Sequence, residues 1–241
     1  YFWPAVEQYV ECTHEYWRSN GKFVPNIVLR LASGGYIGGG LYHSQNIEGA
    51  LATLPGARIV CPSFADDAAG LLRTAMRSRG FTLYLEPKAL YNSVEASSVV
   101  PEEFEVPFGK ARIRREGTDL SMITYGNTTH FCLNVAERLA QEGWSVEVID
   151  LRSLIPLDKE TIYASVKKTS KALVVHEDKV FSGFGAEIAA GIGTELFRYL
   201  DAPVQRVGSV FTPVGFHPIL EKAILPTEDK IYDAARTLLE Y

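Results

Sequence analysis

The sequence lacks the features that mark several classes of protein. It has no basic cluster, and its formal net charge of −5 gives no support for nucleic-acid binding. No apolar run approaches the length of about 18 residues that a membrane-spanning helix needs, so we expect no contact with a membrane. The three cysteines, Cys12, Cys61 and Cys132, lie far apart and form no C-x-x-C pair. This spacing argues against a disulfide framework and favours a reducing, cytoplasmic setting.

The start of the chain lacks an initial methionine and a signal peptide. It opens on the large residues Tyr1, Phe2 and Trp3, and apolar side chains recur at helical spacing as far as Tyr16. This pattern predicts a helix that needs a packing partner from its first turn. We therefore expect the sequence to be part of a longer chain or of a larger assembly.

Apolar residues, in contrast, are abundant. They make up 46% of the 241 residues, which predicts a sizeable core in one large domain or two modest ones. Short apolar runs at 27–31, 58–61 and 82–85 indicate buried strands. Ser63 precedes an amphipathic helix, and we expect its hydroxyl to accept a hydrogen bond from the Asp66 N–H. This alternation of strand and helix predicts a parallel, right-handed unit.

The alternation of predicted strands and helices is interrupted in the middle of the chain and then continues. Residues 92–110 carry prolines and glutamates without periodicity, and we expect an extended linker there. Residues 110–115 alternate basic and apolar side chains, which is typical of an edge strand with a solvated face. Further strands are predicted at 121–125, 146–149, 172–175 and 204–207, and Asp158 and Thr227 are expected to cap two of the helices between and after them. We therefore expect a first domain over 1–91 and a doubly wound α/β domain over 111–241.

One glycine-rich segment stands out as a candidate functional site. Residues 34–45 read GGYIGGGLYHSQ, so five glycines come just before His43. Neither a G-x-G-x-x-G fingerprint nor a Walker loop is present. Glycines let a ligand approach the backbone, and the near-neutral pKa of histidine suits proton transfer. The alternative is a flexible turn followed by a polar histidine with no chemical role.

Two polar groups follow strand ends, where sites of α/β proteins often lie. His176, Glu177 and Asp178 form the first group. A catalytic role is one interpretation, and polarity at an interface or a helix cap is the one we favour. Glu86 and Lys88 form the second group, and a surface or subunit-contact pair is the favoured interpretation.

Several blocks, taken together and in order, resemble a known family. They read GGGLYHSQ at 38–45, PGARIVCPS at 55–63, DAAGLL at 67–72, LEPK at 85–88, DLRSLIPLD at 150–158 and HED at 176–178. The chain resembles the β subunit, or the β half of a fused chain, of the E1 component of thiamine-diphosphate-dependent 2-oxo acid dehydrogenases. The resemblance implies a truncated pyrimidine-binding domain over 1–91 followed by a transketolase C-terminal-like domain.

The resemblance also implies a reaction and partners. Such enzymes decarboxylate a 2-oxo acid oxidatively and pass the acyl unit to the lipoyl arm of the E2 protein. Thiamine diphosphate is held between subunits, and an E1 α subunit or α half grips the diphosphate through Mg²⁺. A second E1 β subunit and the E2 subunit-binding domain are further partners. Branched-chain acids are our first expectation for the substrate, and pyruvate is the alternative.

By the same resemblance, His43 matches the active-site histidine of the β subunit, a proton donor or positioner during acylation of the lipoyl group. Tyr1 matches an aromatic residue that lies against the aminopyrimidine ring of the cofactor. The glutamate that activates the cofactor lies upstream of that aromatic position in the family. The 241 residues alone are therefore expected to be inactive, and no residue among them is expected to bind a metal.

A potassium site found in many family members is not expected here. The matching positions, 75–80, read AMRSRG, so Ser78 and Gly80 replace the two side-chain ligands, and Arg77 and Arg79 add positive charge. Hard cations prefer oxygen ligands and negative surroundings.

Two other functions stay open. The chain could belong to another thiamine enzyme, such as a transketolase or a deoxyxylulose phosphate synthase, although Arg198 and Arg206 are weak candidates for the phosphate-binding residues that these need. It could also be a non-catalytic module for dimerisation and E2 docking, to which its acidic balance is suited.

Overall fold

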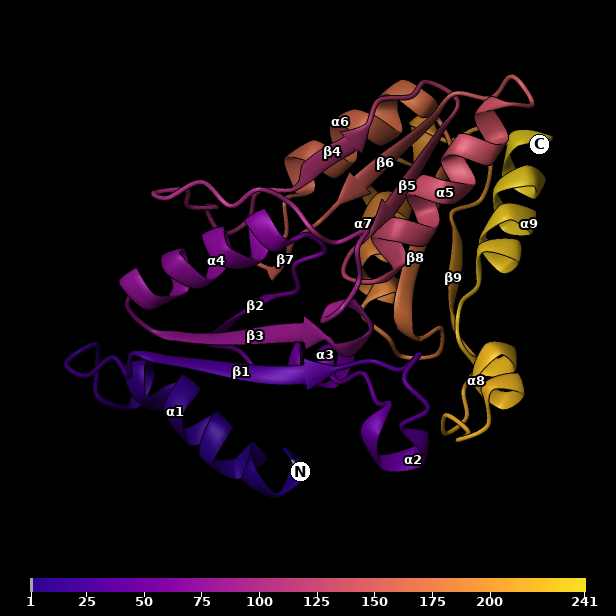
Figure 1. The fold of residues 1–241 in the computed structure, drawn as a ribbon. Helices are drawn as coiled ribbons and strands as arrows, with labels where there is room; N and C mark the ends of the chain where they lie inside the picture. The colour runs from indigo at the N-terminus through magenta and orange to yellow at the C-terminus, as the bar shows by residue number, and fades with distance from the viewer. Residues whose placement is uncertain (1) are drawn as a thin grey trace.

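The computed structural model describes residues 2–241 and contains two β-sheets with helices on their faces (Figure 1). The first sheet has the strand order β1-β3-β2-β7, in which the first three strands are parallel and β7 is antiparallel. Its strands are β1 (Ile27–Ser33), β3 (Phe81–Pro87), β2 (Ala57–Val60) and β7 (Ser153–Ile155). The three strands predicted for the first part of the chain are thereby confirmed. The short β7 was not predicted.

Helices α1 (Val6–Arg18) and α4 (Ala65–Arg77) lie on opposite sides of this sheet (Figure 1). The Tyr9 ring of α1 packs edge-on against Phe81, with centroids 5.1 Å apart. The helix after Ser63 is confirmed, but the predicted cap is wrong. The Asp66 N–H donates to the Ser98 hydroxyl over 2.7 Å, and the Ser63 hydroxyl contacts Asp150 of the second sheet instead. Short elements complete this part: η1 (Trp3–Ala5), α2 (Gly40–His43), α3 (Glu48–Leu51) and η2 (Lys88–Leu90).

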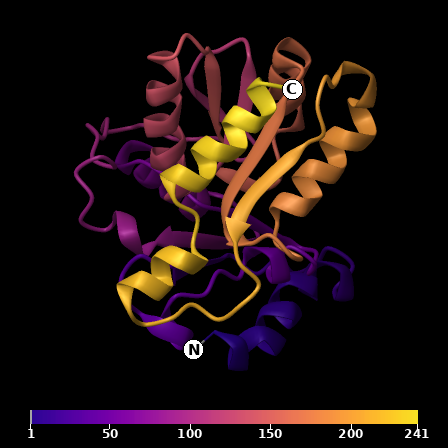
Figure 2. The same ribbon diagram turned by 90° about the vertical axis from the view of Figure 1, so that its right-hand side faces the viewer.

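The second sheet has the order β4-β6-β5-β8-β9, with β4 antiparallel to β6 and the other pairs parallel. Its strands are β4 (Arg112–Arg115), β6 (Val146–Asp150), β5 (Leu120–Thr124), β8 (Ala172–Lys179) and β9 (Gln205–Ser209), and its helices are α5 (Thr128–Ala140), α6 (Lys159–Thr169), α7 (Gly185–Glu195), η3 (Phe197–Tyr199), α8 (Pro218–Ile224) and α9 (Glu228–Leu239). Helices α5 and α9 pack on one face and α6 and α7 on the other, which confirms the doubly wound arrangement (Figure 2).

Alternation along the strands explains this double covering. In β5, Met122 faces α5 and α9, and Ile123 faces α6 and α7, because successive side chains of a strand point to opposite faces. The predicted caps are confirmed: Asp158 accepts a hydrogen bond from the Thr161 N–H, and Thr227 accepts one from the Lys230 N–H. Among residues 2–241, no helix is long and apolar enough to cross a bilayer.

Strand β7 connects the two halves of the chain, because it follows β6 in sequence but pairs with β2 of the first sheet. One hydrophobic core accordingly includes Ile59 of the first sheet and Ile149 of the second. Residues 92–110 contain no helix or strand, and much of the segment is exposed, but its later part packs along α4. Val106 is buried against Gly70, and Arg73 donates to the Phe104 carbonyl. We keep 1–91 and 111–241 as proposed domains, with 92–110 as the linker between them.

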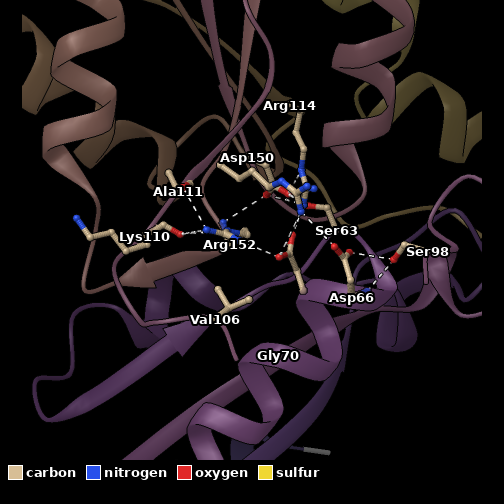
Figure 3. Close-up of polar contacts among 12 residues, drawn as sticks. Ser63, Asp66, Gly70, Ser98, Val106, Lys110, Ala111, Arg114, Asp150 and Arg152 are labelled. Carbon is tan, nitrogen blue, oxygen red and sulfur yellow. Dashed lines mark hydrogen bonds and ion pairs between the residues drawn. The ribbon is translucent and has the colours of Figure 1, made fainter. Parts of the chain in front are cut away.

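A buried ionic network lies where α4 meets the second sheet (Figure 3). Arg152 donates to Asp67 over 2.8 Å, and Arg114 donates to Asp150 over 2.7 Å and also to Asp67. The two carboxylates are fully buried, and the two guanidinium groups are nearly so. The edge strand at 110–115 is confirmed, but a fully solvated polar face is wrong, because Arg114 points inward to pair with these carboxylates. The network therefore joins α4 to the second sheet.

Candidate functional site

The glycine-rich segment forms the loop that follows β1. It leads into the single turn of α2, whose last residue is His43, and the imidazole is exposed. Helix α8 lies beside α2 at the carboxyl ends of β8 and β9 (Figures 1 and 2). His43 is thus placed where loops of both halves of the chain meet. This is the edge of parallel sheets at which ligands of α/β proteins bind.

His43 lies in a groove of about 510 Å³. The groove is lined by Phe2, Trp3, Leu31, Ala32, Tyr42, His43, Gln45, Ile47 and Lys88. The Trp3 indole N–H donates to the Gln45 side chain over 3.1 Å, which fastens η1 to the loop. Aromatic and apolar walls with a few polar groups are typical of sites for planar organic ligands. Tyr1, the predicted cofactor-binding residue, lies outside the described residues.

Lys88 is the cationic side chain of this groove. It is half-buried, and burial lowers its pKa, while the charge of Glu177 raises it. In the described part of the chain no hydrogen bond or ion pair neutralises its ammonium group. Glu86, the other member of the polar group at the end of β3, contacts Arg30 and Tyr91. The groove therefore presents a cation that can attract an anionic ligand.

The backbone of the loop adopts a left-handed conformation at alternate residues. The φ values are +84° at Gly34, +61° at Tyr36, +64° at Gly38 and +63° at Gly40. Tyr36 is not a glycine, and its hydroxyl is held by the Pro226 carbonyl at 2.8 Å. Backbone of this kind turns neighbouring N–H groups toward a common concave side, which favours anions.

Three carboxylates from the second half of the chain occupy that concave side and the end of the loop. Glu177 accepts a hydrogen bond from the Gly35 N–H. Glu221 of α8 accepts from the N–H groups of Ile37 and Gly38 over 3.2 and 3.3 Å. The Asp178 carboxylate lies against Gly49, where a Cβ would be 2.7 Å from its oxygen. These contacts support the interpretation of the His-Glu-Asp group as interface polarity rather than as a catalytic set. No sequence pattern marked Glu221, which lies on a helix that was not predicted.

His176, the third member of that group, points into the core instead. Its ring is covered by Gly183, Gly185 and Gly208, and a Cβ at Gly185 would lie 2.2 Å from the ring. Burial lowers the pKa of the imidazole to about 4. His176 is therefore a neutral core residue at pH 7.

The acidic groups beneath the loop have strongly raised pKa values. Burial, together with the charge of Asp178, raises the pKa of Glu48 to about 8, and burial raises that of Glu177 to about 7. The Tyr125 hydroxyl donates to Glu48 over 3.1 Å, beside a cavity of only about 10 Å³. Burial makes these carboxyl groups lose their protons at higher pH than exposed ones do.

A stability effect follows from Glu48. A raised pKa in the folded state contributes stability that is complete below the unfolded pKa near 4.5 and is lost as the pH rises toward 8. We expect Glu48→Gln to remove this loss. From pH 5 to pH 7, the free energy of unfolding of the variant should therefore rise by on the order of 2 kcal/mol relative to that of the wild type. Urea unfolding at both pH values measures it. The lowered pKa of His176 makes the free energy of unfolding fall toward acid pH. This effect is the same in both proteins and therefore cancels when they are compared. Equal pH slopes for the two proteins would contradict the prediction.

The segment that matches the potassium loop is tied to its own chain. Arg58 donates to the Arg79 carbonyl over 2.6 Å, and the Ser78 hydroxyl donates to the Thr74 carbonyl. The Arg58 guanidinium group is thus bonded to a backbone carbonyl, the type of group that would otherwise coordinate a potassium ion. Within the described range, residues 2–241, no group of three or more potential ligands among His, Cys, Asp and Glu is placed to hold a metal ion. The absence of a potassium site stays a prediction.

Comparison with known families matches both halves of the chain. Residues 14–94 match the transketolase pyrimidine binding domain, and residues 109–231 match the transketolase C-terminal domain. The split gene transketolase, described as an inactive beta4 tetramer, has a similar fold, with a TM-score of 0.70 and 22% identity over 96% of this chain and 73% of that one. The chain thus has the two domains and the fold of a transketolase-type protein.

Curated relatives narrow this class. The 2-oxoisovalerate dehydrogenase subunit beta of Bacillus subtilis is 40% identical over 99% of this chain and 73% of its own length. The pyruvate dehydrogenase E1 component subunit beta of the same organism is 39% identical over 93% and 69%. A mitochondrial pyruvate dehydrogenase E1 component subunit beta-1 of Arabidopsis thaliana is 40% identical over 90% and 61%. The chain belongs to the family of E1 β subunits of 2-oxo acid dehydrogenases.

Proposed function

We propose that this chain is the β portion of an E1 enzyme that decarboxylates a short 2-oxo acid oxidatively and transfers the acyl group to the lipoyl group of E2. The observation that carries the proposal is the position of His43, exposed in an aromatic groove at the carboxyl edge of the first sheet. A branched-chain acid is the first candidate substrate, and pyruvate is the second. Relatives of both kinds are about equally similar to this chain.

The groove fits one side of thiamine diphosphate. Trp3 and Tyr42 offer partly or fully exposed aromatic rings, against which a pyrimidine ring can stack, and Ile47 adds an apolar wall. When bound, the cofactor supplies the carbanion chemistry that releases carbon dioxide. No carboxylate lines this groove among residues 2–241, and Mg²⁺ prefers oxygen ligands, so we assign the metal and the diphosphate that it holds to an α subunit or α half. Tyr1 stays a proposed ring contact.

His43 and Lys88 have separate roles in this proposal. When the lipoyl disulfide is opened, one sulfur takes the acyl group and the other takes a proton. His43 supplies or directs that proton. Lys88 attracts the carboxylate of the 2-oxo acid into the groove.

Reconstitution tests the proposal. We expect the full-length gene product that contains this chain, assembled with an α subunit, to release carbon dioxide from 2-oxoisovalerate or pyruvate when thiamine diphosphate and Mg²⁺ are present. The 241 residues alone should release none. The ratio of kcat/KM for the two acids identifies the substrate. A complete complex that decarboxylates neither acid but uses a sugar phosphate would support a transketolase-type enzyme instead.

A non-catalytic docking module is the second candidate, favoured by exposed apolar side chains near α8. Phe211, Phe216 and Ile219 are each about two-thirds to three-quarters exposed, and Phe181 packs on Phe211 with ring centroids 4.6 Å apart. Large exposed apolar patches mark interaction surfaces, such as one for a second β subunit or for the subunit-binding domain of E2. A pull-down with E2 beside the decarboxylase assay separates the candidates, because a docking module binds E2 without any turnover.

A further inference from the structure

The loop that carries His43 is fastened by carboxylates at its beginning, its middle and its end. Glu177 holds Gly35, Glu221 holds Ile37 and Gly38, and Asp178 lies against Gly49. All three acidic residues come from the second half of the chain, whereas the loop belongs to the first half. The position of His43 therefore depends on contacts between segments that are far apart in sequence.

The glycines at the two ends of the loop are required by these contacts. A Cβ at Gly34 would lie 2.5 Å from a carboxylate oxygen of Glu177, and a Cβ at Gly49 would lie 2.7 Å from one of Asp178. Both distances are far below van der Waals contact, so a side chain at either position would displace the carboxylate. Glycine at these two positions thus leaves the room that the carboxylates need to approach the backbone of the loop.

The charge of the carboxylates matters because hydrogen bonds to ionised groups are about twice as strong as neutral ones. Glu177 is buried beneath the loop, and the ionisable groups that interact with it are Lys88, Glu221, Asp178 and Glu48. Lys88 also lines the groove together with His43. Loss of the charge on Glu177 therefore weakens its hydrogen bond with the Gly35 N–H. It also removes a negative charge that acts on Lys88.

We propose that Glu177, Asp178 and Glu221 are positioning residues that hold the loop of residues 34–49 in the conformation that presents His43 to the groove. The anchoring itself concerns this chain alone, and its effect on acyl transfer rests on the proposed function. The proposal differs from a purely structural role for the acidic groups, because it predicts a local loosening of the loop and a defect in the step that uses His43.

Hydrogen exchange of the loop amides tests the anchoring. In Glu177→Gln and in Glu221→Gln we expect the amides of Gly35, Ile37 and Gly38 to exchange about tenfold faster at pH 8, with exchange in β5 unchanged. Glu147→Gln is the matched control, because Glu147 is a buried glutamate of β6 that pairs with Lys168 instead of the loop. Unchanged loop exchange in both anchor variants, or an equal rise in the control, would overturn the proposal.

Kinetics of the assembled enzyme test the positioning. We expect the two anchor variants to lower kcat for acylation of an E2 lipoyl domain about tenfold, with KM for the 2-oxo acid unchanged. Asp178→Asn provides a third variant if one of the others does not fold. Faster loop exchange with wild-type acylation would limit these residues to a structural role and overturn the proposal. A wild-type complex without any acylation would instead contradict the proposed function and leave the exchange result interpretable.

Discussion

Replacement of His43 by alanine in the assembled E1 complex should lower the rate of acyl transfer to the lipoyl group by about 10²–10⁴-fold, which is the usual contribution of a positioned general acid. The imidazole is exposed at the last residue of α2, so the substitution removes little packing. The folded structure should therefore persist, and the loss should be confined to the step that needs the proton.

Two assays separate that step from decarboxylation. Mass spectrometry of an E2 lipoyl domain follows acylation, and an artificial electron acceptor follows decarboxylation without the lipoyl group. Leu41→Ala is the matched control, because Leu41 is a half-exposed residue of the same turn that does not line the groove. Wild-type acylation by the His43 variant would remove the residue from the mechanism.

Much of the fold follows from local sequence patterns. Apolar runs of four or five residues in a strand–helix alternation marked the parallel strands of both sheets, including the central β8, which is buried on both faces. Asp158 and Thr227 could be identified as helix caps, because each side chain accepts a hydrogen bond from an N–H group only three residues later in the chain. Such features depend on near neighbours, so the sequence alone was sufficient.

Features that depend on distant contacts could not be predicted in this way. Ser63 fits a helix cap by spacing, but the hydroxyl of Ser98 satisfies the Asp66 N–H and leaves Ser63 to contact Asp150. Arg114 has the alternating pattern of a solvated edge strand, yet buried carboxylates turn it inward. Strand β7 is too short for its periodicity to show which sheet it joins.

The residues of the candidate site also differ in whether the sequence could identify them. The glycine run and the resemblance to the E1 β family pointed to His43 before its groove was known. The polar group at the end of β8 was visible in the sequence, but its role was not, because Glu177 and Asp178 contact a loop more than a hundred residues earlier. Glu221 carried no signal, since a single glutamate on a short helix resembles any solvated side chain.

The buried ionic network gives the largest expected effect on stability. We expect Asp67→Ala to lower the free energy of unfolding by about 3–5 kcal/mol, because removal of one partner leaves buried charge without compensation. Asp67 is fully buried and contacts both Arg114 and Arg152. Without it, the Arg114 guanidinium would keep Asp150 as its carboxylate partner, whereas the Arg152 guanidinium would be left with the carbonyls of Lys110 and Ala111 (Figure 3).

The neighbouring residue supplies the control for this prediction. Asp66 also lies in the first turn of α4 and also pairs with an arginine, but its partner Arg112 is half-exposed. Exposed ion pairs contribute about 0–1 kcal/mol, so Asp66→Ala should cost no more than about 1 kcal/mol beyond its contact with Ser98. Urea unfolding at pH 7 compares the two variants. Equal losses would mean that the charges at the start of α4 act through the helix itself, whereas a much larger loss for Asp67 would show that desolvated charge holds α4 against the second sheet.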